Sequence, residues 1–136
     1  MYLLDTNACN RILNNSSSAL VTRLRQHRPD EIALCSVVKA ELLYGAQRSS
    51  RIAENLRVLD RFFEPFYSFP FDDNCMQAFS RIRTDLERTG TPIGPYDLLI
   101  AATAVAGGRT LVTANTREFS HVAGLTIENW EEVAAG

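Results

Sequence analysis

The chain has 136 residues, a formal net charge of −2 and a pI near 5.7. This length is typical of one domain with its own core, so we expect residues 1–136 to form a single domain. The slight acidity excludes a polybasic mode of nucleic-acid binding. It does not exclude a nucleic-acid partner, because acidic side chains can gather in one cleft while arginines line its rim.

The three cysteines and the apolar runs indicate in which environment the protein works. Cys9, Cys35 and Cys75 lie far apart and form no Cys-x-x-Cys pair, which argues against a disulfide framework and against a zinc site. The longest apolar run, residues 98–106, has about half the length that a membrane-spanning helix needs. We therefore expect a cytoplasmic protein with reduced thiols and no membrane association.

Five segments are predicted to be strands, because each is a short apolar or aromatic run bounded by turn residues or prolines. They are residues 1–4, 32–35, 66–71, 110–113 and 125–130. The first, second and fourth are the most apolar and are expected in the centre of the sheet. The third, flanked by prolines, and the last are expected to pair less extensively.

Helices are predicted between these strands from apolar residues at helical spacing. The expected helices start at Ser36 and end before Gly45, cover residues 51–63, run from Asp72 or Asp73 to Gly90, and run from Gly94 to Gly107. Strands that alternate with helices predict an α/β fold with a mostly parallel central sheet and helices on both faces.

Four short segments each carry a carboxylate at the edge of an apolar stretch. The residues are Asp5, Glu41, Asp97 and Glu118. The first follows a predicted strand, the second lies in the helix after the next strand, the third opens a helix and the fourth follows another strand. In parallel sheets ligands bind beyond the carboxyl ends of the strands, so the pattern predicts that these acids gather at one edge.

Each acid also has a simpler explanation when it is taken alone. Asp5 could be a turn residue, and Asp97 could be favoured by the dipole at the start of its helix. Glu118 could lie in a solvated loop, where Asn115 is an equally good oxygen ligand. Glu41 could be an ordinary surface residue of its helix, but we expect it to face the core, because it shares a helix face with Val37, Val38, Tyr44 and Gly45.

Three or four carboxylates at one edge would raise one another's pKa unless a cation joined them. All-oxygen ligation favours Mg²⁺ or Mn²⁺ over zinc, and His27 and His121 lie outside the four segments. Such an ion can lower the pKa of a bound water and stabilise charge on a phosphoryl group. The residues therefore predict a metal-dependent phosphodiesterase.

The chain resembles the PIN-domain ribonucleases, and more closely the VapC-type toxins of bacterial toxin–antitoxin pairs. The resemblance covers nearly the whole chain and is carried by residues 4–7, 40–46, 92–97, 111–119 and 124–130. It implies a Rossmann-like PIN domain that uses Mg²⁺ or Mn²⁺ to cut RNA endonucleolytically, often tRNA. It also implies a cognate antitoxin as partner and a homodimer.

Asp5, Glu41 and Asp97 match the three acids on which this family's pattern depends most. The fourth position is open between Glu118 and Asn115, because many PIN domains place an aspartate in that segment. By the same resemblance, Thr6 and Asn7 would lie beside Asp5 and contact either its neighbours or the substrate.

Two other readings compete with the nuclease. An aspartyl phosphatase of the dehalogenase type also begins with a strand that ends in Asp, but its usual second Asp is Asn7 here. A binding or scaffold module could have kept the fold and lost the metal. In that case replacement of Asp5 or Asp97 would leave the biological activity unchanged.

Overall fold

The computed structural model describes residues 1–132 and contains one five-stranded sheet. Its strands are β1 (Tyr2–Leu4), β2 (Ile32–Cys35), β3 (Tyr67–Phe69), β4 (Thr110–Val112) and β5 (Ile127–Glu128). All neighbouring strands pair in parallel, in the order β3-β2-β1-β4-β5. The predicted parallel sheet is therefore confirmed, with β1 at its centre.

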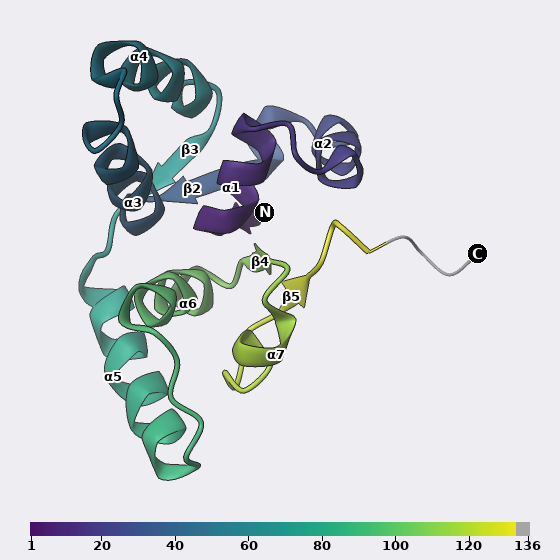
Figure 1. Ribbon diagram of the computed structural model, residues 1–136. Helices are drawn as coiled ribbons and strands as arrows, with labels where there is room; N and C mark the ends of the chain where they lie inside the picture. Colours follow the sequence, from purple (N-terminus) through teal and green to yellow (C-terminus); the bar gives the residue numbers. More distant parts are fainter. Residues whose placement is uncertain (133–136) are drawn as a thin grey trace.

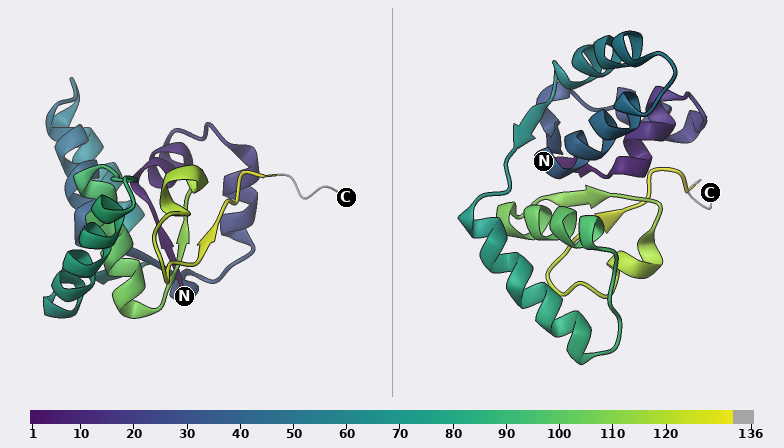
Figure 2. Two further views of the ribbon diagram at one scale, coloured as in Figure 1. Left: turned by 90° about the horizontal axis from the view of Figure 1, so that it is seen from below. Right: turned by 60° about the vertical axis from the view of Figure 1, so that its left-hand side comes forward.

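The helices lie on both sides of this sheet. They are α1 (Thr6–Leu13), α2 (Ser18–Arg25), α3 (Ser36–Gln47), α4 (Ile52–Phe63), α5 (Asp73–Arg88), α6 (Pro95–Gly107) and the short α7 (Thr116–Phe119), with a 3-10 turn at Pro29–Glu31. Figure 1 and the right-hand view of Figure 2 show α1 to α4 on one side of the strands and α5 to α7 on the other. The predicted α/β layering is thus confirmed.

The predicted C-terminal end of α3 was wrong. The helix begins at Ser36, as predicted, with Cys35 as its N-cap residue, but it continues through Gly45 to Gln47. No helix was predicted at α1, α2 or α7, although Asp5 caps the N-terminus of α1 and Ser17 caps that of α2. Leu20 of α2 and Ala46 in the last turn of α3 are buried in the core, and such tertiary packing overrides local propensity.

The core lies between the central strands and α6. Leu3, Leu4, Leu111 and Ile100 are completely or almost completely shielded from solvent. Parallel strands covered on both faces require such continuous apolar runs. Helix α6 ends at Gly107, as predicted, and the next residue, Gly108, has a left-handed φ of 62° that favours glycine.

No helix within residues 1–132 has the length and apolar character needed to cross a membrane.

Candidate active site

Asp5 lies at the carboxyl end of the central strand β1. Its backbone amide donates to the Val112 carbonyl at 3.1 Å, which extends the pairing of β1 with β4 by one residue. Its side chain caps α1 by accepting a 2.8 Å hydrogen bond from the Ala8 amide. The sheet and the helix N-terminus together fix this carboxylate in one place.

The Asp5 carboxylate is held in an environment that penalises its charge. Asp5 is only 4% exposed, and this burial raises its pKa above the usual aspartate value. Hydrogen bonds from the Thr113 hydroxyl and the Ala8 amide oppose the rise without cancelling it. A buried carboxylate of this kind gains from a cation that replaces the lost solvation.

Thr113 links two segments of the site, although the sequence analysis gave it no functional role. Its hydroxyl bonds the Asp5 carboxylate and accepts the Asn115 amide at 2.9 Å, and its side chain is buried. The sequence does carry a signal for this role, because Thr113 is a hydroxyl residue that directly follows the apolar strand β4. This strand pairs with β1, which leads into Asp5.

Glu41 is anchored from the opposite side by Thr6. The Thr6 hydroxyl donates to Glu41 Oε1 at 2.6 Å, so the first turn of α1 holds a carboxylate of α3 that is 35 residues away in sequence. Thr6 therefore has the position beside the acids that was expected for it. Asn7 is exposed in the same turn.

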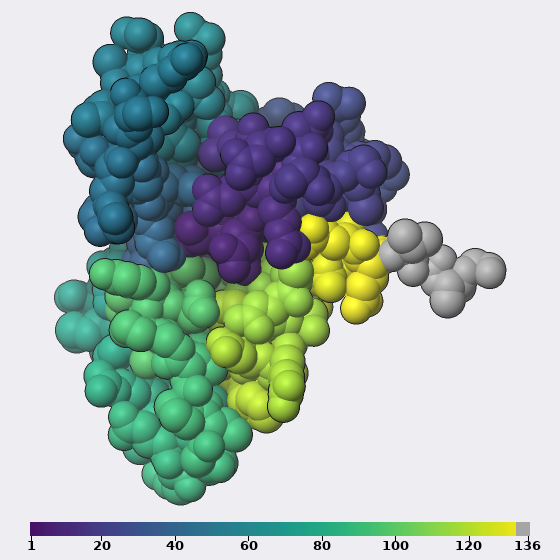
Figure 3. All heavy atoms as spheres, viewed as in Figure 1, coloured from purple at the N-terminus to yellow at the C-terminus, as the bar shows by residue number. Residues whose placement is uncertain are grey.

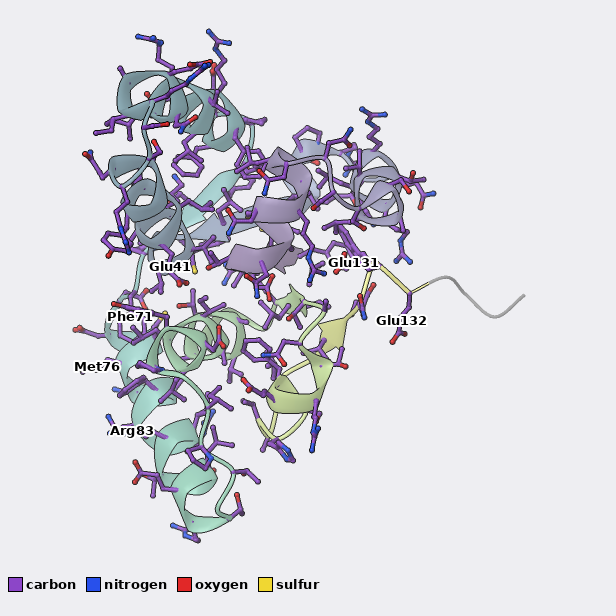
Figure 4. The ribbon with its side chains drawn as sticks, in the orientation of Figure 1. Glu41, Phe71, Met76, Arg83, Glu131 and Glu132 are labelled. Atoms are coloured by element: carbon purple, nitrogen blue, oxygen red, sulfur yellow. The ribbon has the colours of Figure 1, made fainter. Side chains whose placement is uncertain are left out.

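The prediction that Glu41 faces the core is wrong. The buried face of α3 consists of Val38, Leu42 and Ala46, whereas Glu41 is only partly buried and Tyr44 is 61% exposed. Figure 4 shows Glu41 on the part of α3 that lies toward α6. The carboxylate thus lies at the rim of the core, where it is accessible to a ligand.

Asp97 is the residue whose pKa is affected by all three of the other acids. It lies in the first turn of α6, and its pKa is raised to about 6, first by burial and then by the charges of Asp5, Glu118 and Glu41, in that order. The helix dipole favours a carboxylate here but does not explain three acidic neighbours. Four separate segments therefore bring negative charge to one place, as the sequence pattern predicts.

The fourth segment presents Glu118 and Asn115 together. Asn115 precedes α7, and its side-chain amide donates to Glu118 Oε2 at 3.0 Å. Glu118 is exposed and lies within this short helix, so the alternative of an irregular loop at this position is wrong. The two candidates for the fourth ligand thus form one hydrogen-bonded pair.

These four segments lie on one face of the molecule. In Figure 3 the N-terminal segment in purple, α6 in green and α7 in yellow-green lie next to one another, with the labels of Figure 1 as a guide. Asp5 directly follows β1, Glu41 lies in α3 after β2, Glu118 lies in α7 after β4, and Asp97 lies in the first turn of α6.

The donor atoms of this site are oxygens. Cys9 and Cys35 are completely buried in the core, and burial raises the pKa of both thiols, which keeps them protonated. Hard cations such as Mg²⁺ and Mn²⁺ prefer carboxylate oxygens, so the chemistry of the donor set fits either ion.

The side chains do not form a closed ligand set as they stand. Within residues 1–132, no group of three or more His, Cys, Asp or Glu side chains is placed so that it could hold a metal ion. The charge interaction among the four acids acts over longer distances than metal coordination does. It therefore shows that the four acids lie near one another.

Comparison with known proteins agrees with this geometry. The PIN-domain family model matches residues 2–125. Among curated proteins, the chain is 37% identical to Ribonuclease VapC2 of Rickettsia felis, over 97% of this chain and 99% of the relative. It is 35% identical to the tRNA(fMet)-specific endonuclease VapC of Shigella flexneri, over 95% and 97% of the two chains.

Solved structures show the same fold. A chain of the VapBC complex of Salmonella typhimurium bound to DNA matches with a TM-score of 0.89 and 34% identity, covering 95% of this chain and 97% of that one. A chain of VapBC2 from Rickettsia felis, bound to a DNA fragment from its promoter, matches with a TM-score of 0.87 and 36% identity over 95% and 98%.

Proposed function

This chain belongs to the PIN-domain family and is a VapC-type ribonuclease, and from this premise we propose that it is a toxin that cuts RNA with the help of Mg²⁺ or Mn²⁺. The observation that supports the metal is the raised pKa of Asp97, which reflects first its burial and then the charges of three other carboxylates nearby. A divalent cation would offset this repulsion.

We assign the ligand oxygens to Asp5, Glu41 and Asp97, with Glu118 as the fourth acid. Asp5 is fixed by its helix cap and Glu41 by Thr6, so these two provide a rigid part of the site. Asp97 is half-buried and Glu118 is exposed, and these two side chains have room to change rotamer when a cation binds. Asn115 then orients Glu118 through their hydrogen bond.

A bound ion of this kind supplies a more acidic water and stabilises charge on a phosphoryl group. The chain itself contributes rigid oxygen ligands and a buried aspartate whose surroundings exclude water. Positioning and electrostatic stabilisation are the main sources of rate in such phosphoryl chemistry.

The substrate is proposed to be RNA, and more specifically tRNA. The support is the name of the Shigella flexneri relative, which is a tRNA(fMet)-specific endonuclease. Hydrolysis of a phosphodiester fits the oxygen ligands of the site. A phosphatase of the aspartyl type would need a second acid at Asn7, which is an exposed amide residue in α1.

We propose an antitoxin as the protein partner, because the similar solved structures are VapBC complexes. A groove of about 510 Å³ between α1, α3 and α4 suits such a partner. Leu13, Leu42 and Val58 line it, and Glu41 lies at its edge, so a partner there would also cover the acids. Residues of α4 form one wall of this groove. We also propose that the chain forms a homodimer.

The test is cleavage of total tRNA by purified protein with Mg²⁺ or Mn²⁺, with EDTA, and by the Asp5→Asn and Asp97→Asn variants. Asn keeps the shape of Asp and can still cap a helix, so both variants are expected to fold. Asp60→Asn is the charge-matched control, because Asp60 is exposed on α4. Discrete fragments from wild type and Asp60→Asn alone, abolished by EDTA, are the expected result.

Equal cleavage by all variants would contradict the proposal and point to a contaminating nuclease. Absence of cleavage of any RNA by wild-type protein, at any metal concentration, would favour the scaffold reading. Circular dichroism of each variant distinguishes a lost site from a lost fold.

A further inference from the structure

Arg11 is an exposed cation on the helix that begins at the acids. Asp5 is the N-cap residue of α1, and Arg11 lies in the last turn of the same helix. Asn7 and Arg11 are four residues apart and are both exposed, so they share one solvent-accessible face of α1. This face carries an amide and a guanidinium away from the acidic site.

The partner of Arg11 is a carboxylate that lies 120 residues later in the sequence. Arg11 Nη1 donates to Glu131 Oε2, and the two side chains are 44% and 20% exposed. Figure 4 shows Glu131 on the segment that runs from β5 toward α1. Ion pairs that solvent can reach contribute little to stability, so another anion can displace the carboxylate from the guanidinium.

The order of the strands brings Glu131 to this place. The carbonyl of Glu128, at the end of β5, accepts a 3.0 Å hydrogen bond from the amide of Thr113, whose hydroxyl bonds Asp5. The Asn129 side chain then accepts the Glu131 amide at 2.9 Å, which turns the chain after β5. The neighbouring strands β1, β4 and β5 thus lead from Asp5 to Glu131.

The charges of this pair also reach the acids. Burial has the largest effect on the pKa of Asp5 and raises it, while the charge of Arg11 lowers this pKa and that of Glu131 raises it. An RNA phosphate that approaches a group of carboxylates is repelled unless a cation lies nearby. Arginine suits this task, because its planar guanidinium can donate two parallel hydrogen bonds to one phosphate.

The segment after β5 is anchored without the Arg11–Glu131 pair. Trp130 is 1% exposed, and its ring stacks on the His27 ring with 4.9 Å between the ring centres. The Arg23 guanidinium lies 5.5 Å from the centre of the Trp130 ring. These contacts can keep the segment in place when Arg11 exchanges its partner.

We propose that Arg11 binds an RNA phosphate next to the one that is cut, and that Glu131 holds the guanidinium until the RNA displaces it. This inference rests on the proposed ribonuclease function. Arg11 supplies positive charge beside a site made of carboxylates, and Asn7 lies one helical turn closer to the acids on the same face. Arg11 is thus a substrate-binding residue, and Glu131 sets how tightly it binds.

A tether that fastens the segment after β5 to α1 is the competing role for this pair. The two roles predict opposite effects when Glu131 loses its charge. A tether is weakened by Glu131→Gln as it is by Arg11→Gln. A phosphate-binding arginine is released by Glu131→Gln, and RNA then binds more tightly.

The experiment first maps the cut in an RNA that the wild-type protein cleaves. Matched oligoribonucleotides then carry one uncharged methylphosphonate linkage at each position around the cut. Fluorescence anisotropy measures the Kd of each RNA at several salt concentrations, in an Asp97→Asn background that is expected not to cleave. The proteins carry in addition Arg11→Gln, Arg11→Lys, Glu131→Gln, or Arg11→Gln together with Glu131→Gln.

Arg28→Gln is the matched control. Arg28 Nε donates to Asp30 Oδ1 at 3.0 Å in another exposed ion pair, and both residues precede β2. This pair therefore lies at the amino end of the strands, whereas the acids lie at the carboxyl end. Urea denaturation of every variant measures its stability separately from RNA binding.

We expect Arg11→Gln to raise the Kd of intact RNA by about 10-fold, the effect of losing a hydrogen bond to a charged group. The slope of log Kd against log salt should become shallower by about 0.7, the value for one phosphate contact in single-stranded RNA. One methylphosphonate position should weaken binding by Arg28→Gln and not by Arg11→Gln. Arg11→Lys should recover part of the affinity.

Glu131→Gln should lower the Kd by up to about 5-fold, which corresponds to the loss of an exposed ion pair. The double variant should bind RNA as Arg11→Gln does, because Glu131 acts only through Arg11. The Arg28→Gln control should keep the Kd and the salt slope of the protein that carries Asp97→Asn alone.

An unchanged Kd in Arg11→Gln, with every methylphosphonate penalty retained, would overturn the phosphate site while leaving the nuclease intact. Weaker RNA binding and lower stability in both Arg11→Gln and Glu131→Gln would overturn it in favour of the tether. A changed Mn²⁺ affinity of Arg11→Gln, with the methylphosphonate penalties retained, would also overturn it and give Arg11 a role through Asp5. Failure of wild-type protein to cut any RNA would remove the proposed function, and with it this inference.

Discussion

The Thr6 hydroxyl donates a 2.6 Å hydrogen bond to Glu41 Oε1 and so joins α1 to α3 across the carboxyl edge of the sheet. The bond fixes one carboxylate oxygen and leaves the other available for a ligand. Outer groups that orient carboxylates in this way tune the affinity of metal sites.

Replacement of Thr6 tests this relationship. We expect Thr6→Val to lower Mn²⁺ affinity by about 10- to 100-fold, because Glu41 loses its orienting donor. Thr6→Ser keeps the hydroxyl and should stay close to wild type. Calorimetric titration with Mn²⁺ measures the difference, and equal affinities for all three proteins would show that Thr6 does not position Glu41.

The Asp5 variants should separate stability from activity. Asp5→Asn retains the side-chain oxygen that accepts a hydrogen bond from the Ala8 amide. Asp5→Ala loses this helix cap, which should lower the free energy of unfolding by about 1 kcal/mol. Both changes remove the buried charge and should abolish cleavage. Urea denaturation without metal is expected to find Asp5→Ala less stable than Asp5→Asn, and the reverse order would contradict the capping role.

The pH dependence of stability follows from Asp97, whose pKa is raised to about 6. The folded state holds this proton more tightly than the unfolded state, so without metal the stability should fall as pH rises from about 4 to about 6. Because Asp97 is only half-buried, solvent screening limits the effect, and we expect about 1 kcal/mol. Thermal unfolding at several pH values in EDTA measures this loss of stability. The Asp97→Asn variant should lack the part of the pH dependence that comes from Asp97.

Metal binding should show the opposite trend with pH. Asp97 must be ionised to bind a cation, so Mn²⁺ affinity should rise as pH increases through about 6. At pH 7, metal at ten times its dissociation constant should add about 1.4 kcal/mol to the stability of the wild type. Absence of any such gain in the wild type, with Mn²⁺ or Mg²⁺, would contradict a metal site at these acids.

Glu118 and Asn115 can be distinguished by paired variants. If Glu118 is the fourth acid, Glu118→Gln should reduce kcat by at least about tenfold, because a ligand charge is lost. Asn115→Ala removes only the donor to Glu118 and should have a smaller effect. The opposite order in single-turnover cleavage would assign the ligand role to Asn115.

Thr113 offers a test at a residue without a charge. Thr113→Val keeps the buried shape but removes the hydroxyl that bonds Asp5 and accepts from Asn115. We expect a loss of about 1 to 3 kcal/mol in unfolding free energy, because buried polar groups are left unpaired. Thr113→Ser should recover most of this stability in urea denaturation.

The sequence by itself predicted the five strands, the four long helices that follow β2 and β3, and the acids that we propose as ligands. Apolar runs such as residues 32–35 are buried on both faces in a parallel sheet, so they are visible without any knowledge of the fold. Asp5 and Asp97 could be predicted for a similar reason, since each lies at the boundary of an apolar element. In a parallel sheet the carboxyl ends of the strands lie at the same edge, so residues that follow the strands gather there.

Only the tertiary structure decided how these groups contact one another. The Thr6–Glu41 bond spans 35 residues, and the Thr113–Asp5 bond joins two strands, so neither has a local signal in the sequence. The orientation of Glu41 was predicted wrongly, because helical periodicity gives relative angles within α3 and not the side on which α6 packs. The order of the strands likewise brought Glu131 to Arg11, which lies 120 residues earlier in the chain.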